Sequence, residues 1–365
     1  MRDAFDDKQM IDALERLVTV ESPSVDTEAC VRCADALTEV ARSTIGVAPE
    51  RIVVDGSTHL RWRFGSSPTK VAVIGHLDTV WPMGTLAELP FEVKDGVARG
   101  PGSFDMKSGL VMALHALASL DDLEGVTLLV NSDEEIGSLS SRALVEDTAR
   151  GARAALVLEP SVDGALKTAR KGVGFYRLNV TGKAAHAGLE PENGANALIA
   201  MADAVRAIAA FADPAQGTTV TPTTATAGTA RNVVPAQASV EIDLRGETQA
   251  ELERVDRAIR GLAPTVDGTS FAFGGGINRP PLDEAASAEL FARAQRVAAG
   301  LGLAPLRGQP VGGGSDGNFT AGIGVPTLDG LGAVGDGAHA RNEHVIVASM
   351  PERARLVAAL VRDLL

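Results

Sequence analysis

A buried strand that ends in two polar residues is the feature that most constrains how this chain folds. Residues 71–74 are apolar, and a short apolar run of this kind is typical of a strand covered on both faces. His76 and Asp78 follow, and side chains two apart on an extended segment point to the same side. The pair suits a metal-bound imidazole held by a carboxylate, and it suits an ordinary hydrogen-bonded loop equally well.

Two further apolar strands end in acidic residues. Residues 125–131 lead into Glu134 and Glu135, and residues 154–158 lead into Glu159. Helical patterns separate these strands, and alternation of strand and helix predicts a mostly parallel sheet with helices on both faces. In sheets of this kind, functional side chains gather at the carboxyl ends of the strands.

A glycine-rich turn carries a further acidic residue, Asp105. Residues 100–105 form this turn and place Asp105 at the start of a helix predicted over 106–120. Another helix is predicted over 139–149. Asp105 is therefore expected close to the acids at the strand ends.

The pattern changes after Gly172, which predicts an inserted domain. Residues 173–180 and 239–245 alternate between apolar and polar, and a capping box at Thr248 begins a helix. The expected order of elements is βαββαβ, a ferredoxin-like α+β arrangement with helices on one face of the sheet. The predicted domains are a catalytic domain in two segments, 1–172 and 282–365, and the inserted dimerisation or lid domain, 173–281.

Charge and hydropathy exclude some classes of partner. The 365 residues carry 34 lysines and arginines against 47 acidic residues, a net charge of −13. This balance argues against binding to nucleic acid or to an anionic membrane surface. No stretch of about 18 apolar residues occurs, and the first residues lack the apolar segment of a signal peptide, so a cytoplasmic location is expected.

The polar residues at the expected strand ends and turns form a candidate metal-binding set. They share nitrogen and oxygen donors without thiolates: His76, Asp105, Glu134, Glu135, Glu159 and His339. Such donors suit zinc, with manganese or cobalt as possible substitutes, in a catalytic site. A pair of metals needs a bridging carboxylate, and Asp105 is the candidate because a tight turn presents it.

The chain resembles the dinuclear zinc metallopeptidases that include glutamate carboxypeptidases, aminoacylases, acetylornithine deacetylase and succinyl-diaminopimelate desuccinylase. The matching motifs span nearly the whole chain and run in this order: GHLDTV at 75–80, GPGSFDMKSG at 100–109, NSDEEIGS at 131–138, LEP at 158–160, AAHAG at 184–188, RNVVP at 231–235 and GAHARNEHV at 337–345. The sequences around AAHAG and at 312–319 are most similar to the glutamate carboxypeptidase branch.

The resemblance implies roles for the metal-site residues. It assigns one zinc to His76, Asp105 and Glu159, and the other to Asp105, Glu135 and His339. It makes Glu134 the general base and Asp78 the residue that orients His76. It also implies a cis peptide bond after Asp105.

The resemblance assigns further roles outside the metal site. His186 is expected to act in the active site of a partner subunit within a homodimer, stabilising an oxyanion, and Asn232 has a similar implied role. Arg245 resembles the arginine that binds a substrate carboxylate. Weaker candidates for substrate binding are Lys171, Arg279 and the backbone at Gly314. Without the family, His186 reads as a surface-loop histidine and Arg245 as an exposed strand arginine.

These features predict a metal-dependent hydrolase that cleaves an amide or peptide bond beside a free carboxylate. The expected substrate is a small N-acyl amino acid or peptide, from which a C-terminal glutamate or similar amino acid is released. A deacylase of N-acyl amino acids or a dipeptidase is the close alternative. A catalytically silent metal-binding protein on the same fold is a remote alternative. Such a protein would not need to keep both Glu134 and a complete ligand set, and this chain has both.

Overall fold

The computed structural model describes residues 5–365 and divides into two compact units. Unit 1 comprises the described residues up to Ala169 together with Leu282–Val311 and Ser315–Leu365. Unit 2 comprises Arg170–Pro281 and Gly312–Gly314. These bounds differ from the expected domain boundaries only by residues 170–172 and 312–314.

Unit 1 holds most of the helices and strands. Its helices are α1 (Asp7–Val18), α2 (Thr27–Ile45), α3 (Thr85–Glu88), α4 (Ser108–Ala118), α5 (Arg142–Ala149), α8 (Glu284–Gly300), α9 (Gly317–Gly322) and α10 (Ser349–Leu364). Its strands are β1 (Glu50–Val54), β2 (Ser57–Arg63), β3 (Val71–His76), β4 (Glu92–Lys94), β5 (Val97–Arg99), β6 (Val126–Asn131), β7 (Ala154–Val157), β8 (Leu166–Arg170), β13 (Gly308–Val311), β14 (Thr327–Leu328), β15 (Gly335–Asp336) and β16 (His344–Ile346).

The main sheet of unit 1 has the strand order β1-β2-β6-β3-β7-β14. Strands β6, β3, β7 and β14 are parallel, whereas β1 and β2 join the edge as an antiparallel hairpin. The prediction of a mostly parallel sheet is therefore confirmed. Because β6, β3 and β7 are parallel neighbours, their carboxyl ends meet at one edge of the sheet.

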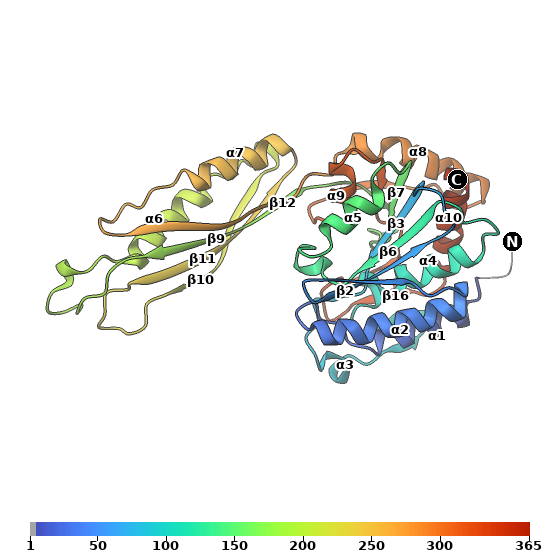
Figure 1. Ribbon diagram of the computed structural model, residues 1–365, viewed down its shortest axis with the longest axis horizontal. Helices are drawn as coiled ribbons and strands as arrows, with labels where there is room; N and C mark the ends of the chain where they lie inside the picture. The colour runs from blue at the N-terminus through green and yellow to red at the C-terminus, as the bar shows by residue number, and fades with distance from the viewer. Residues whose placement is uncertain (1–4) are drawn as a thin grey trace. The chain divides into compact units, whose positions relative to one another are not determined.

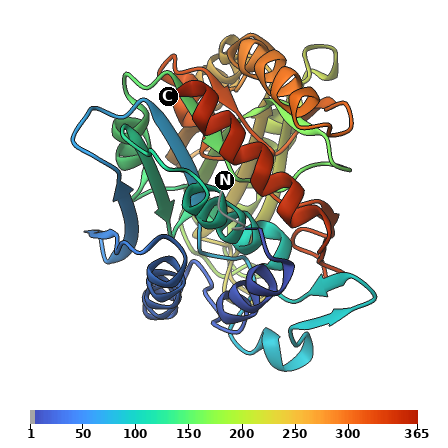
Figure 2. The same ribbon diagram turned by 90° about the vertical axis from the view of Figure 1, so that its right-hand side faces the viewer.

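Helices cover both faces of this sheet (Figure 1), as expected. Side chains alternate between faces along each strand, so Val73 and Leu128 join the core formed with α2, α4 and α10, whereas Ile74 and Leu129 pack with α5 and α9. Figure 2 is viewed onto α10, the red helix, which packs against α4. Burial on both faces explains why these strands read as continuous apolar runs.

A smaller antiparallel sheet of unit 1 has the order β15-β16-β5-β4. His344 of β16 pairs with Arg99 of β5, and Asp336 of β15 pairs with His344. The turn after β5 and the loop before β16 are therefore held at adjacent strand ends. These two segments contain Asp105 and His339.

Unit 2 has the predicted βαββαβ order. Its elements are β9 (Gly172–Thr181), α6 (Ala197–Ala209), β10 (Thr219–Ala227), β11 (Gln237–Gly246), α7 (Gln249–Arg260) and β12 (Ser270–Arg279). The strand order β10-β11-β9-β12 is fully antiparallel. Alternate residues of β11, such as Ile242 and Leu244, are buried with the helices, and Thr248 caps α7 by accepting a hydrogen bond from the backbone N–H of Glu251.

Two predicted helix starts are wrong. The helix expected from residue 106 begins at Ser108, because Asp105 and Met106 have non-helical dihedral angles; the peptide bond between them is cis, as the resemblance implied. The helix expected from residue 139 begins at Arg142. The Asp133 carboxylate accepts hydrogen bonds from the backbone N–H of Ser140 and the hydroxyl of Ser141, which holds these residues in a turn.

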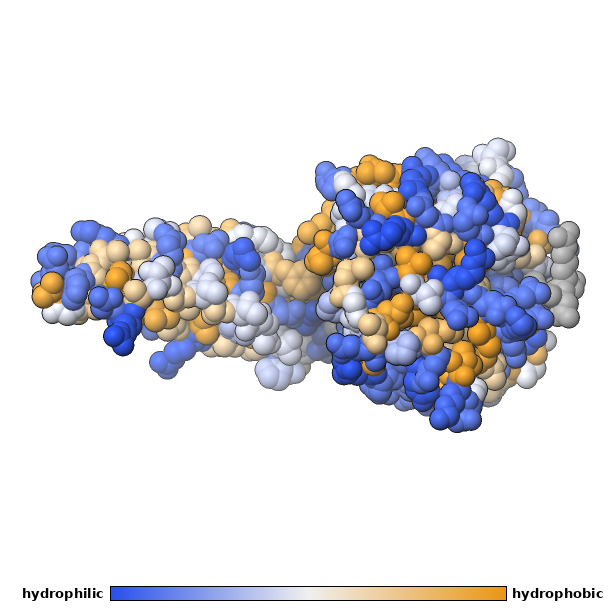
Figure 3. All heavy atoms as spheres, turned by 90° about the horizontal axis from the view of Figure 1, so that it is seen from below, coloured by the Kyte–Doolittle hydropathy of each residue, from blue (hydrophilic) through white to orange (hydrophobic). Residues whose placement is uncertain are grey.

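The described part of the chain contains no helix long and apolar enough to cross a membrane. Hydrophilic and hydrophobic residues are mixed over the face drawn in Figure 3.

Candidate metal centre

Three neighbouring strands deliver histidine and carboxylate side chains to one edge of the main sheet. His76 is the last residue of β3, Glu134 and Glu135 begin a 3-10 turn after β6, and Glu159 lies two residues after β7. His76, Glu134 and Glu159 are buried, and Glu135 is half-buried. The parallel pairing of the strands brings these residues together.

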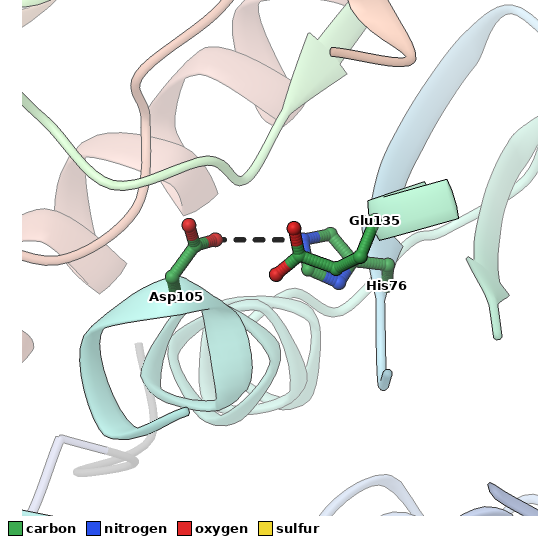
Figure 4. A group of neighbouring side chains, drawn as sticks. All are labelled: His76, Asp105 and Glu135. Atoms are coloured by element: carbon green, nitrogen blue, oxygen red, sulfur yellow. Dashed lines mark ion pairs between the residues drawn. The ribbon is translucent and has the colours of Figure 1, made fainter. Parts of the chain in front are cut away.

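The Asp105 carboxylate faces His76 (Figure 4), and its second oxygen faces His339. Its Oδ1 is 3.4 Å from His76 Nε2, and its Oδ2 is 3.2 Å from His339 Nε2. Glu159 Oε1 is 3.6 Å from His76 Nε2, and Glu135 Oε2 is 3.2 Å from His339 Nε2. The structure thus contains two clusters of nitrogen and oxygen donors that share one carboxylate.

The donor atoms fit bound metal ions. His76 Nε2, Asp105 Oδ1 and Glu135 Oε1 are buried without a hydrogen-bond partner among the described residues. Unpaired buried polar atoms are costly, and metal coordination would satisfy them. Imidazole and carboxylate donors, with no thiolate, are typical ligands of catalytic zinc. Two groups of donor atoms lie close enough together to hold an ion: His76 with Asp105 and Glu135, and His76 with Glu134 and Glu159.

The tautomer of His76 supports the same conclusion. Its Nδ1 lies 3.0 Å from the backbone carbonyl oxygen of Asp78. Because a carbonyl can only accept a hydrogen bond, Nδ1 carries the proton and a neutral His76 has its lone pair on Nε2. That lone pair faces Asp105 and Glu159, as a metal ligand requires.

The pKa values show that the cluster attracts positive charge. Burial raises the pKa of Glu135 to about 7, although His339 opposes this effect. The carboxylates of Asp105 and Glu135 raise the pKa of His339 to about 10. Burial alone would raise the pKa of Asp105, but His339 and His76 outweigh it and hold this pKa below its ordinary value. Metal ions would supply the positive charge that protons otherwise provide.

Asp78 has more contacts than the expected one with His76. Its carboxylate is 3.4 Å from His76 Nδ1, but its hydrogen bonds come from the backbone N–H groups of Glu134 and Glu135, each at 3.2 Å, and from the Ser24 hydroxyl at 2.7 Å. Both the backbone carbonyl and the carboxylate of Asp78 therefore lie beside His76 Nδ1. The carboxylate orients the turn that carries both glutamates.

Two buried residues near the cluster are not among the site residues predicted from the sequence. Lys167 is buried on β8, with its Nζ 3.6 Å from Glu159 Oε2. Glu343 is buried and accepts a hydrogen bond from Trp81 Nε1 at 2.8 Å. Glu343 lies within the motif at 337–345, but only the tertiary contacts show which groups it touches.

In unit 2 the structure brings His186 and Asn232 onto adjacent segments. His186 pairs with Val233 in an isolated bridge, and Ala187 N–H donates to the Asn232 carbonyl at 2.9 Å. His186 Nδ1 accepts hydrogen bonds from the backbone N–H groups of Gly188 and Leu189, each at 3.1 Å. The proton of a neutral His186 is therefore on Nε2, where it can be donated.

The expected substrate-binding residues of unit 2 have varied surroundings. Arg245 forms a two-pronged ion pair with Asp243, with both hydrogen bonds at 2.8 Å. Lys171 Nζ is 3.5 Å from Glu247 and donates to the Gly217 carbonyl. Arg279 is buried beside Asn278, whereas Gly314 is half-buried and its carbonyl accepts a hydrogen bond from Arg170 at 3.2 Å.

Comparisons with known proteins identify relatives along nearly the whole chain. Residues 72–363 match the family described as Peptidase family M20/M25/M40. Carboxypeptidase G2 of Pseudomonas sp. (strain RS-16) is 31% identical, covering 97% of this chain and 89% of the relative. Succinyl-diaminopimelate desuccinylase 2 of Shewanella loihica is 28% identical, covering 84% of this chain and 88% of the relative.

The fold is also shared with solved structures. The M20 family metallo-carboxypeptidase Sso-CP2 from Sulfolobus solfataricus superimposes with a TM-score of 0.74 at 15% identity, covering 99% of both chains. The chain belongs to peptidase family M20/M25/M40, a family of metal-dependent hydrolases. The family predicted from the sequence motifs is confirmed.

The cluster geometry predicts that zinc stabilises the folded protein. Metal-free protein titrated with zinc should bind two ions per chain, and free zinc at 100 times its dissociation constant should add about 2.7 kcal/mol per site to the free energy of unfolding. Elemental analysis and thermal unfolding measure the two quantities. Less than one bound equivalent in the presence of excess zinc would contradict the two-cluster interpretation.

Proposed function

We propose that the protein is a dinuclear zinc hydrolase that cleaves an amide or peptide bond beside a free carboxylate. The observation that carries this proposal is the placement of Asp105, whose two oxygens face His76 and His339. In this assignment His76, Asp105 and Glu159 hold one ion, and Asp105, Glu135 and His339 hold the other. The ion-pair distances within each set support this division.

In this proposal Glu135 is a metal ligand and Glu134 is the general base. Glu135 Oε2 lies 3.2 Å from His339 Nε2, and Glu135 also groups with His76 and Asp105. Glu134 groups with His76 and Glu159. When bound, zinc polarises the scissile carbonyl and lowers the pKa of a bound water. Glu134 then accepts the proton of the attacking water and returns it to the leaving amine. Asp78 keeps both glutamates in place through their backbone N–H groups.

The favoured substrate is an N-acyl or peptidyl amino acid with a C-terminal glutamate or a similar residue. Carboxypeptidase G2 and a p-aminobenzoyl-glutamate hydrolase of Escherichia coli are relatives whose names agree with this class. Desuccinylases and acetylornithine deacetylase are also relatives, which keeps a deacylase of N-acyl amino acids as the second candidate. A silent metal-binding protein is disfavoured because Glu134 and every proposed ligand are present.

Arg245 is the proposed ligand of the substrate's free carboxylate. Asp243 engages the Nε and Nη2 edge of its guanidinium, which fixes the orientation of the planar group. The end of the fork, formed by Nη1 and Nη2, still offers N–H donors for a second carboxylate. Arg279, Lys171 and the Gly314 backbone remain candidates for other parts of the substrate.

We also propose a homodimer formed through unit 2. Strand β10 is an edge strand, exposed at most positions, and such an edge is available for pairing with a second chain. The neighbouring helix α6 exposes Leu198 and Ile199, with Ile199 53% accessible. In this dimer His186 acts on the substrate of the partner subunit, donating from Nε2 to the oxyanion of the tetrahedral intermediate.

Replacing the two adjacent glutamates should separate their roles. Glu134→Ala should lower kcat by about 10²- to 10⁴-fold, because the general base is lost, and should still bind two zinc ions. Glu135→Ala should lose zinc, because a ligand is removed. Steady-state kinetics on N-acyl-glutamates and elemental analysis test both variants. Identical zinc content in the two variants would contradict the assignment.

Substitution of Arg245 should act through the substrate carboxylate. Arg245→Lys should reduce kcat/KM nearly as much as Arg245→Ala, by about 2 kcal/mol or more in transition-state stabilisation, because a lysine cannot replace the planar fork. The penalty should shrink for a substrate whose free carboxylate is an amide. Arg177→Lys, which alters another ion-paired arginine of the same sheet, is the matched control. An equal penalty on acid and amide would make Arg245 a structural residue.

Disrupting the exposed face of α6 should separate the subunits. Ile199→Asp places a charge on the proposed interface, so light scattering should report a monomer, with activity lost because His186 acts across the dimer. Val53→Asp changes an apolar residue of unit 1 that is 61% accessible, more than Ile199, and should leave the dimer intact. A wild-type chain that is monomeric and active at assay concentration would overturn the dimer proposal.

A further inference from the structure

Glu343 is a buried carboxylate with four hydrogen-bond donors around it. Its Oε2 accepts from Trp81 Nε1 at 2.8 Å and from Gly102 N–H at 2.9 Å. Its Oε1 accepts from Phe104 N–H at 2.8 Å and from Asp105 N–H at 3.1 Å. The side chain is 4% exposed, so water contributes little to its solvation. Each oxygen therefore has two donors, which suits an ionised carboxylate.

Three of these donors belong to the turn that carries Asp105. A buried backbone N–H needs an acceptor, and Glu343 supplies one for each of these three groups. The turn requires glycine at position 102. Gly102 has φ +73°, and a Cβ at this position would lie 2.6 Å from the Thr79 side chain. The direction of the Asp105 side chain thus depends on where Glu343 holds its backbone.

The segment 337–343 also carries His339, so one loop contacts Asp105 in two ways. Within the loop, Ala340 N–H donates to the Gly337 carbonyl at 2.8 Å and Glu343 N–H donates to the Ala340 carbonyl at 2.9 Å. His339 faces the Asp105 carboxylate, whereas Glu343 binds the Asp105 backbone. Strand β16 follows immediately and pairs with β5, which precedes the turn. The pairing of β16 with β5 and the hydrogen bonds of Glu343 therefore hold the loop against the turn.

We propose that Glu343 is a positioning residue that sets the metal affinity of the centre by fixing Asp105 and His339 relative to each other. The inference rests on the proposed metal centre, but it does not depend on the substrate. Glu343 touches neither metal nor substrate in this scheme. It acts through the backbone of the bridging aspartate and through the loop of the histidine that faces it.

Zinc binding to metal-free full-length protein, measured by competition with a chromogenic chelator, tests this role without any substrate. In Glu343→Gln an N–H₂ group replaces an oxygen that accepts two hydrogen bonds, so two of the four contacts become donor against donor. We expect zinc affinity to fall about 10- to 100-fold, as is typical when residues that orient metal ligands are replaced. Excess zinc should restore kcat, and KM should change little, because the substrate contacts are intact.

Two variants serve as controls. Glu88→Gln changes a carboxylate that lines the same 260 Å³ pocket as Glu343 but forms an exposed ion pair with Arg341. Trp81→Phe removes one donor to Glu343 and leaves the three backbone contacts. Both should bind zinc within about threefold of the wild type. Wild-type zinc affinity in Glu343→Gln, or an equal loss in Glu88→Gln, would overturn the proposal.

Chemical rescue distinguishes positioning from a general loss of stability. In Glu343→Ala the pocket lined by Trp81, Gly100 and Pro101 offers a path by which formate can reach the vacated position. Added formate should recover part of the lost zinc affinity in Glu343→Ala and leave the wild type unchanged. If formate leaves the zinc affinity of Glu343→Ala unchanged, the contact between the carboxylate and the backbone amides is not the cause of the loss in zinc affinity. A chain that binds zinc as expected but fails to hydrolyse N-acyl-glutamates would refute the proposed substrate and leave this inference standing.

Discussion

Burial of several carboxylates at one edge of a parallel sheet is the constraint on which the rest of unit 1 depends. Removing an ionised carboxylate from water is costly unless it is paired or hydrogen-bonded. Asp105 and Glu135 face histidines, and Glu159 lies beside Lys167, yet buried donor atoms are still left without partners among the described residues. The fold therefore holds together a set of ligands whose mutual repulsion a bound cation would relieve.

Two other carboxylates accept hydrogen bonds from backbone N–H groups. Asp78 accepts the N–H groups of Glu134 and Glu135, and Glu343 accepts those of the turn that ends at Asp105. Both are buried, so these contacts are stronger than they would be at the surface. Holding backbone amides with a carboxylate fixes the direction of each ligand before any metal arrives, which is the preorganisation that a precise site requires.

Unit 2 supplies groups of a different chemical kind. His186 has its Nδ1 occupied by two backbone N–H groups and its Nε2 available as a donor, and Arg245 is oriented by Asp243. Neither residue is a metal-ligand type in these surroundings. N–H donors of these two kinds bind oxyanions and carboxylates in proteins.

Local patterns in the sequence predicted most of the elements and the candidate ligands. Apolar runs before His76, Glu134 and Glu159 indicated buried parallel strands, and the alternation along 239–245 indicated a sheet with one buried face, because these periodicities are local properties of the chain. Only the tertiary structure decided that the Asp78 carboxylate holds a turn, that Arg245 is paired with Asp243 and that Glu343 binds the Asp105 backbone. Glu343 and Asp105 are 238 positions apart, and a hydrogen bond across such a separation leaves no periodic signal in either segment.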